Sequence, residues 1–307
     1  MIVLATIEDE LAQMLAGGRD IQDIALQPYS YRTTHWLAAL DVRYADGSSE
    51  SLILKDVGSV GGGRPGFAHD PLREIDVYRR LLPGTRLGTA SFRAAVVEPF
   101  HDRFWLAMER VDATELWQIG SFESWVRVAR WLADMHMRLR HAESEHLVHW
   151  TPEYIETWIA RARAFSRDPA VTVAARRTAE LTERVLALPS GFVHGELYPS
   201  NVLVDVPTGR VCAVDWETAG IGPQLLDLAA LTSGSWSPRE RRQLAAAYWR
   251  RTKTTMSLDE LLVELAVCRL LVALQWLGWS QQWTPPPEHA HDWLADVRLL
   301  VEEVGLE

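Results

Sequence analysis

The sequence predicts an α+β protein in which a small antiparallel sheet precedes a larger, mainly helical part. Three β-like runs lie near the start of the chain, and they cover residues 21–28, 33–44 and 51–57. Asp46-Gly47 is a hairpin signal between the second and third runs. From Ser121 onward, apolar residues recur at helical spacing instead. This change of period indicates two differently built parts of the chain.

The composition predicts a sizeable core and argues against a nucleic-acid partner. The 307 residues are 48% hydrophobic, which suffices for one large domain or two lobes. A net charge of −10 disfavours a nucleic-acid-binding surface and would tolerate a cationic substrate, although ordinary solubility of an acidic protein is the simpler explanation. Cys212 and Cys268 lie in apolar runs, so we expect core residues rather than a disulfide or a zinc site.

The N-terminal residues and the most apolar stretch of the chain predict a cytoplasmic protein with no membrane partner. Residues 1–15 contain acids and no basic stretch, so they do not form a signal peptide. The most apolar stretch, 261–279, is interrupted by Glu264 and Arg269 and is therefore not expected to span a membrane.

Start and stop signals place two helices around the predicted strands. We expect Thr6 to cap a helix over residues 7–15, which ends at Gly17-Gly18. A second helix begins at Asp70-Pro71 and runs to about Leu82, because Asp caps well and Pro favours the first turn.

Lys55 and Glu74 are charged residues in apolar surroundings. Lys55 closes an apolar strand, where a lysine either protects a sheet edge or performs a function. Glu74 shares a helical stripe with Tyr78 and Leu81, so it faces the packed side and needs a counter-charge. We expect Lys55 to supply that charge, and a surface pair of Glu74 with Arg73 or with a lysine elsewhere is the alternative.

The larger part is predicted to contain a series of amphipathic helices. They cover residues 121–139, 151–166, 173–188, 225–232 and 292–304, with two more starting at the capping boxes of Ser237 and Ser257. His136 falls on an apolar face, where a hydrogen-bonded core histidine is the expected role. Residues 220–223 are predicted to form a loop, and 105–109 a further strand.

Two short β runs, 202–204 and 211–214, are predicted to form a hairpin around a turn at 207–209. The hairpin brings Asn201 and Asp215 side by side, so an amide oxygen and a carboxylate can share one cation. Mg²⁺ is held in this way, with waters and phosphate oxygens completing its octahedron.

The order of residues in this segment resembles the aminoglycoside phosphotransferase and choline kinase-like family. The resemblance rests on His194-Gly195-Glu196-Leu197, Asn201 five positions after Glu196, and Asp215-Trp216-Glu217 beyond the hairpin. It implies a bilobal protein-kinase-like fold with an N-terminal nucleotide-binding lobe, 1–109, and a C-terminal lobe, 110–307. It also implies transfer of the γ-phosphoryl group of ATP or GTP to a hydroxyl of a small molecule. The family usually has Asp where this chain has Glu196.

The resemblance implies roles for individual residues. Lys55 would hold the phosphates and Glu74 would position Lys55, while Glu196 would accept or orient the acceptor hydroxyl. Asn201 and Asp215 would hold Mg²⁺. Structural support falls to His194 and to Asp227, for which a solvent-facing helical acid is the alternative.

The nucleotide contacts are less specific in sequence. The resemblance points to Ser30, Arg32, Thr33 and Thr34 as phosphate-binding residues, with a plain polar turn as the alternative. It points to the hinge around Glu109 and Val111 as the adenine-binding backbone. The glycine-rich residues 58–66 are not a P-loop, because no Lys-Ser/Thr helix start follows them.

The acceptor side is predicted from Glu217 and from the tryptophans Trp276, Trp279 and Trp283, which contact substrate or merely pack in the core. Candidate acceptors are an aminoglycoside or other antibiotic, a sugar, an amino sugar or a choline-like amine. The alternative class is a pseudo-kinase that binds nucleotide without turnover. The joint presence of Lys55 and Glu74 with both metal ligands favours the enzyme.

Overall fold

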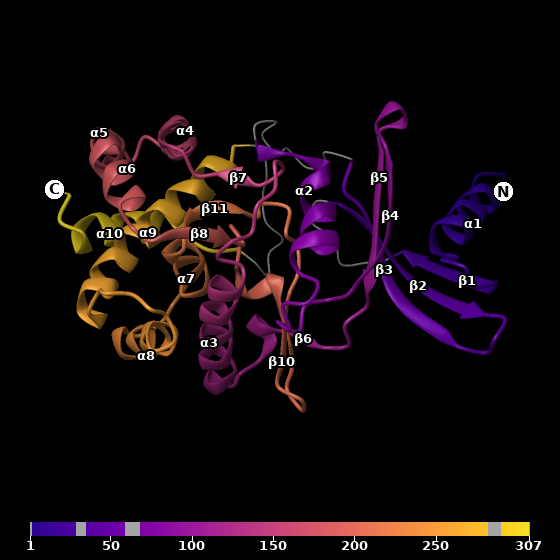
Figure 1. Cartoon of the computed structure of the whole chain (residues 1–307). Coiled ribbons are helices and arrows are strands. Elements are labelled where there is room, and N and C mark those ends of the chain that lie inside the picture. Colours follow the sequence, from indigo (N-terminus) through magenta and orange to yellow (C-terminus); the bar gives the residue numbers. More distant parts are fainter. Residues whose placement is uncertain (1, 29–34, 59–67, 282–289, 307) are drawn as a thin grey trace.

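An antiparallel sheet and a mainly helical part lie at opposite ends of the molecule (Figure 1). The computed structural model describes residues 2–28, 35–58, 68–281 and 290–306. Its antiparallel sheet has the strand order β1-β2-β3-β5-β4. The strands are β1 (Ile21–Pro28), β2 (Trp36–Tyr44), β3 (Ser49–Asp56), β4 (Phe92–Glu98) and β5 (Arg103–Glu109). The predicted strands and the hairpin at Asp46-Gly47 are confirmed, whereas β4 was not predicted.

The first helix, α1 (Ile2–Leu15), covers one face of this sheet, where Leu11 and Leu15 are fully buried. The prediction that this helix begins after Thr6 is wrong. No Gly or Pro interrupts the residues before Thr6, so the helical backbone extends back to Ile2.

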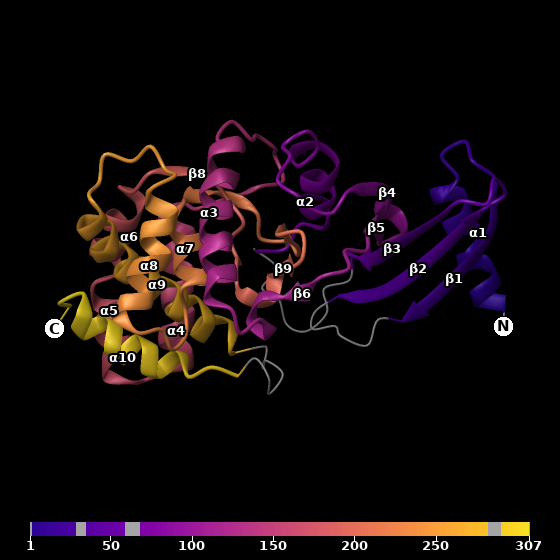
Figure 2. The same ribbon diagram turned by 90° about the horizontal axis from the view of Figure 1, so that it is seen from below.

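Helix α2 (Pro71–Asp76) lies between the sheet and the helical part, as both views show (Figures 1 and 2). Its predicted start is confirmed, because the Asp70 side chain accepts the backbone N–H of Leu72 at 2.8 Å and Pro71 follows directly. A π-helical turn, η2 (Val77–Leu81), continues it to the expected end.

Eight helices of the described chain build the larger part. They are α3 (Phe122–Arg138), α4 (Pro152–Phe165), α5 (Pro169–Arg176), α6 (Thr178–Leu186), α7 (Leu225–Leu231), α8 (Pro238–Trp249), α9 (Leu258–Trp279) and α10 (Trp293–Glu303). Both predicted capping boxes are formed, at Ser237 and Ser257. The single helix predicted over 173–188 is wrong, because Asp168-Pro169 starts a separate helix that ends near Arg177.

The larger part also contains two small three-stranded sheets, with the strand orders β10-β9-β6 and β7-β11-β8. Their strands are β6 (Thr114–Glu115), β7 (Val148–His149), β8 (Ser190–Val193), β9 (Val202–Asp205), β10 (Arg210–Ala213) and β11 (Gly220–Pro223). The loop predicted at 220–223 is therefore wrong. A Cβ on Gly220 would lie 2.4 Å from the carbonyl oxygen of Val148, so glycine permits the close approach of β11 to β7.

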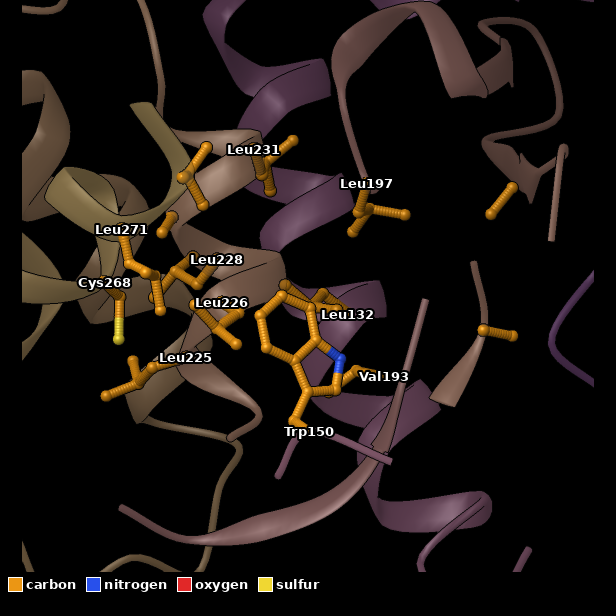
Figure 3. Packing of buried hydrophobic residues seen from close by; sticks show 14 of the residues in the cluster. Leu132, Trp150, Val193, Leu197, Leu225, Leu226, Leu228, Leu231, Cys268 and Leu271 are labelled. Carbon is orange, nitrogen blue, oxygen red and sulfur yellow. The ribbon is translucent and has the colours of Figure 1, made fainter. Parts of the chain in front are cut away.

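The core of the larger part surrounds α9, which packs against α4, α7 and α10. Within this core the ring of Trp150 lies among Leu132, Val193 and Leu226 (Figure 3). Among the described residues α9 is long and apolar enough to cross a membrane by composition, but 78% of its apolar window is buried inside the protein. Both cysteines are buried and unbridged, as predicted.

Candidate active site

A pocket of about 200 Å³ opens between the sheet and the helical part. Six of the residues predicted as catalytic, nucleotide-binding or metal-binding line it together, namely Lys55, Glu74, Glu109, Val111, Asn201 and Asp215. They come from β3, α2, the end of β5 and both ends of the β9–β10 hairpin. Segments that lie more than a hundred residues apart in the chain thus meet in one cavity.

Lys55 is the central cation of this pocket. Its Nζ donates to Glu74 Oε2 at 2.6 Å and to Asp215 Oδ1 at 2.5 Å, and Lys55 and Glu74 are both buried. Burial alone would lower the pKa of the Lys55 ammonium, but the carboxylates of Asp215 and Glu74 outweigh burial and raise that pKa above its ordinary value. Lys55 is therefore held as a cation, and the expected pairing of Glu74 with Lys55 is observed.

The loop before the hairpin is held by Asp227 of α7, which is fully buried. The two carboxylate oxygens of Asp227 accept the backbone N–H groups of His194 at 2.7 Å and Gly195 at 2.9 Å. His136 Nε2 lies 3.0 Å from the same carboxylate and its Nδ1 lies 3.0 Å from the hydroxyl of Tyr248, so this histidine is hydrogen-bonded in the core as predicted. The solvent-facing alternative for Asp227 is wrong.

His194 links the loop to the hairpin. Its Nε2–H donates to the carbonyl of Val214 at 3.0 Å, while Nδ1 faces the backbone N–H of Glu196 at 3.4 Å. Burial lowers the pKa of His194, so the imidazole is neutral and keeps this donor–acceptor arrangement at pH 7. The ring of His194 also lies 4.4 Å from that of Trp216.

Asn201 and Asp215 are brought together by the register of the hairpin. Val202 pairs with Ala213, and the N–H of Val214 donates to the backbone carbonyl of Asn201 at 2.9 Å. The Asn201 side-chain amide donates to the carbonyl of Glu196 at 3.0 Å, which leaves its oxygen as the acceptor atom in the pocket.

This pair of hard oxygen donors suits Mg²⁺, which is usually held by one or two protein oxygens. No cluster of three or more His, Cys, Asp or Glu side chains within the described residues offers a fuller metal site. Water and phosphate oxygens would therefore supply the other ligands. The donor set fits the predicted cation.

Two residues of the site adopt left-handed backbone conformations. Gly195 has φ +85°, and a Cβ at this position would lie 2.4 Å from the carbonyl oxygen of Thr218. Asp215 has φ +65° although it has a side chain, a conformation that costs energy and persists where surrounding bonds hold it.

The predicted hinge residues line the same pocket, but Glu109 has an additional partner. Its carboxylate accepts two hydrogen bonds from Arg210 of β10, at 2.7 and 2.9 Å. This guanidinium, together with the N–H of Ser91, keeps the pKa of Glu109 below its usual range. The predicted phosphate-binding residues Ser30, Arg32, Thr33 and Thr34 lie outside the described residues, as does Trp283.

The predicted acceptor residues fall into different environments. Glu217 is buried and its Oε2 lies 2.5 Å from His35 Nε2. Trp279 is buried against Trp158, with ring centroids 4.9 Å apart, which corresponds to the core-packing alternative. Trp276 is half-buried and stacks on Trp293 at 5.3 Å.

Tyr198 lies in the loop before the hairpin and contacts these aromatic rings. Its ring lies 5.1 Å from that of Trp276 and 6.3 Å from that of Trp293. Burial raises the pKa of Tyr198 well above its usual value, and the nearby Glu196 carboxylate raises it further. Glu196 is half-buried on this side of the loop and is not part of the pocket wall described above.

Sequence reasoning missed His35, Arg73, Tyr198 and Arg210. His35 and Arg210 bind carboxylates of residues 182 and 101 positions away, and no local sequence pattern indicates such partners. Arg73 was considered only as a surface partner of Glu74, yet it is buried. Tyr198 could have been considered from the sequence, because it lies only two residues after Glu196.

Comparison with known proteins gives a family. Residues 42–261 match the model of the phosphotransferase enzyme family. No curated protein sequence matches the chain.

Solved structures of low sequence identity have the same fold. An ethanolamine kinase from Plasmodium vivax has a TM-score of 0.62 at 12% identity, over 92% of this chain and 82% of that one. The choline kinase LicA from Streptococcus pneumoniae has a TM-score of 0.60 at 13% identity, over 98% and 100%. An aminoglycoside phosphotransferase from Streptomyces rimosus has a TM-score of 0.53 at 17% identity, over 90% and 100%. Since the family model covers well over half of the sequence, the chain belongs to the phosphotransferase enzyme family and is a small-molecule kinase with the predicted bilobal protein-kinase-like fold.

Proposed function

We propose that this phosphotransferase moves the γ-phosphoryl group of ATP or GTP, as its Mg²⁺ complex, to a hydroxyl of an amino-bearing small molecule in the cytoplasm. The lobes in this proposal are residues 1–109, which bind nucleotide, and 110–307, which bind the acceptor. The observation that carries it is the Lys55 ammonium between Glu74 and Asp215, in a pocket that also contains Asn201.

Each group has a role that follows from its chemistry. Lys55 binds phosphate oxygens as a point charge, and Glu74 keeps its ammonium directed into the pocket. Asn201 and Asp215 would hold Mg²⁺, which would neutralise charge on the transferring phosphoryl group. Glu196 orients the acceptor hydroxyl and accepts its proton. His194 and Asp227 hold the backbone of the loop that carries Glu196.

Glu196 stands where the family usually has Asp, and this difference changes the position of the carboxylate more than its basicity. The ordinary pKa values of Glu and Asp differ by only about 0.4 unit. One extra methylene displaces the carboxylate by about an ångström, an error that can cost roughly 10²-fold if the backbone does not adjust. Phosphoryl transfer relies mainly on positioning and electrostatics, so an adjusted loop supports turnover.

Relatives support the nucleotide, the cation and the acceptor class. An amicoumacin kinase of this fold is recorded with AMP-PNP and Ca²⁺, another relative with GDP, and the Streptomyces rimosus enzyme with ADP and streptomycin. Ethanolamine, choline and aminopropanol kinases share the fold. Acceptors in these names combine an amine with a hydroxyl group, and the acidic charge of −10 tolerates such cations.

The proposal is tested by thermal shift with Mg-ATP and Mg-GTP, followed by a mass-spectrometric search for phosphate addition in a panel of amino alcohols, amino sugars and aminoglycosides. We expect nucleotide to raise the unfolding temperature and at least one acceptor to gain a phosphoryl group. Nucleotide binding without transfer to any acceptor would favour the alternative, a pseudo-kinase that acts by binding alone.

A further inference from the structure

Helix α2 contacts the segment 215–217 through two consecutive side chains. Besides Lys55, Glu74 binds this segment directly, because its Oε1 accepts the backbone N–H of Trp216 at 3.2 Å. Arg73 Nη1 donates to the backbone carbonyl of Glu217 at 2.5 Å. The amide of Trp216 and the carbonyl of Glu217 are thus both bound by one turn of α2.

The guanidinium of Arg73 is buried and joins three parts of the chain. Its Nη1 also donates to the carbonyl of Ala68 at 2.9 Å, just before α2, and its Nε donates to the carbonyl of His146 at 2.6 Å. A planar guanidinium offers donors in several fixed directions, which suits binding to three separate carbonyls. A lysine ammonium at this position cannot reproduce that arrangement.

The place where these bonds converge is conformationally demanding. Asp215 has φ +65°, which a residue with a side chain adopts only where its surroundings hold it. Arg73 and Glu74 form hydrogen bonds to the backbone of the two residues that follow Asp215, and His35 forms a hydrogen bond with the side chain of Glu217. Contacts made from α2 therefore hold the backbone directly after Asp215.

We propose that Arg73 is a positioning residue that holds Asp215 in its metal-binding orientation by binding the Glu217 carbonyl. This inference rests on the proposed function. It makes α2 and the metal-binding segment one rigid unit, so the Lys55–Glu74 pair and the Asp215 carboxylate are set together. A purely structural link between the lobes would alter stability without a specific effect on the metal.

The test compares Arg73→Gln and Arg73→Lys with Arg80→Gln as a matched control. Arg80 follows on the same helical segment but is exposed and pairs with Asp76 at 3.1 Å. Calorimetry measures ATP affinity with and without Mg²⁺, and electron paramagnetic resonance of Mn²⁺ with ATP reports the metal's surroundings. We expect both Arg73 variants to bind metal-free ATP like the wild type. The factor by which Mg²⁺ increases their ATP affinity should be about tenfold smaller than in the wild type. Their Mn²⁺ spectra should differ from that of the wild type, and Arg80→Gln should match the wild type in both measurements.

Equal Mg²⁺ dependence in wild type and both Arg73 variants would overturn the inference, and so would parallel losses of metal-free and Mg²⁺-bound ATP affinity. If Arg73→Gln does not fold, Arg73→Lys decides, since it keeps the buried charge. Failure of both to fold would assign Arg73 a structural role and also overturn the inference. A wild type that binds neither Mg-ATP nor Mg-GTP refutes the proposed function itself, whereas unaffected Arg73 variants refute this inference alone.

Discussion

Asp227 accepts the backbone N–H of His194 at 2.7 Å, although the two residues are 33 positions apart in the chain. The carboxylate is fully buried, and its second oxygen accepts the N–H of Gly195. A helix in the middle of the larger part thereby sets the backbone of the loop that carries Glu196.

Asp227→Asn should destabilise the protein and lower its activity. An amide has one acceptor oxygen where the carboxylate has two, so one buried N–H group faces a donor. We expect a loss of about 1–3 kcal/mol in the free energy of unfolding, measured by urea denaturation. The matched control is Asp259→Asn, because Asp259 is exposed and pairs with Arg242 at the surface. Equal stability of the two variants would contradict this account.

Lys55→Met should destabilise the protein and abolish turnover, because it leaves Glu74 buried without its counter-charge. We expect a loss of about 3–5 kcal/mol in the free energy of unfolding. Adding Glu74→Leu should recover part of this stability and none of the activity. Lys253→Met is the control, since Lys253 is the chain's other lysine and is exposed. A double variant with restored turnover would remove this pair from the mechanism.

Glu196→Gln should lower kcat by about 10²–10⁴-fold, the usual contribution of a positioned acid–base group, with nucleotide affinity unchanged. The amide retains the shape of the side chain but cannot accept the acceptor's proton. Steady-state kinetics with the acceptor found in the panel and calorimetry with Mg-ATP measure the two effects separately. Asp205→Asn, at the far end of the same hairpin, should behave like the wild type. Turnover equal to the wild type in Glu196→Gln would exclude a role for this carboxylate.

The Glu109–Arg210 pair should give a pH-dependent contribution to stability. Because Arg210 depresses the pKa of folded Glu109, the contribution is complete above the unfolded pKa of about 4.3 and is lost as the pH falls through the lower folded value. At pH 7 we expect the free energy of unfolding of Glu109→Gln to be about 1 kcal/mol lower than that of the wild type. The difference should shrink in urea denaturation below about pH 4.3. The exposed Glu302→Gln serves as control, and a difference that grows in acid would contradict the assignment.

Local patterns were sufficient for much of the fold. The hairpin at Asp46-Gly47, the cap at Asp70 and both capping boxes are interactions within a few residues, so the sequence contains both partners. The glycine-containing β11 was missed because its partners, β7 and β8, lie in earlier parts of the chain. Strand β4 was missed although its partner, β5, follows it directly in a hairpin. The single helix predicted over 173–188 was wrong at its start, where Asp168-Pro169 begins a separate helix that the apolar period did not indicate.

By itself the sequence determined which groups are available: one buried-strand lysine, an acid on the following helix, and the order of loop, asparagine and aspartate around a short hairpin. Tertiary structure alone decided how they are held, since the contacts of Arg73 with Glu217, of His35 with Glu217 and of Arg210 with Glu109 join distant segments. The physical reason is that hydrogen-bond direction and desolvation depend on positions in space, and those positions exist only once the sheet and the helices have packed together.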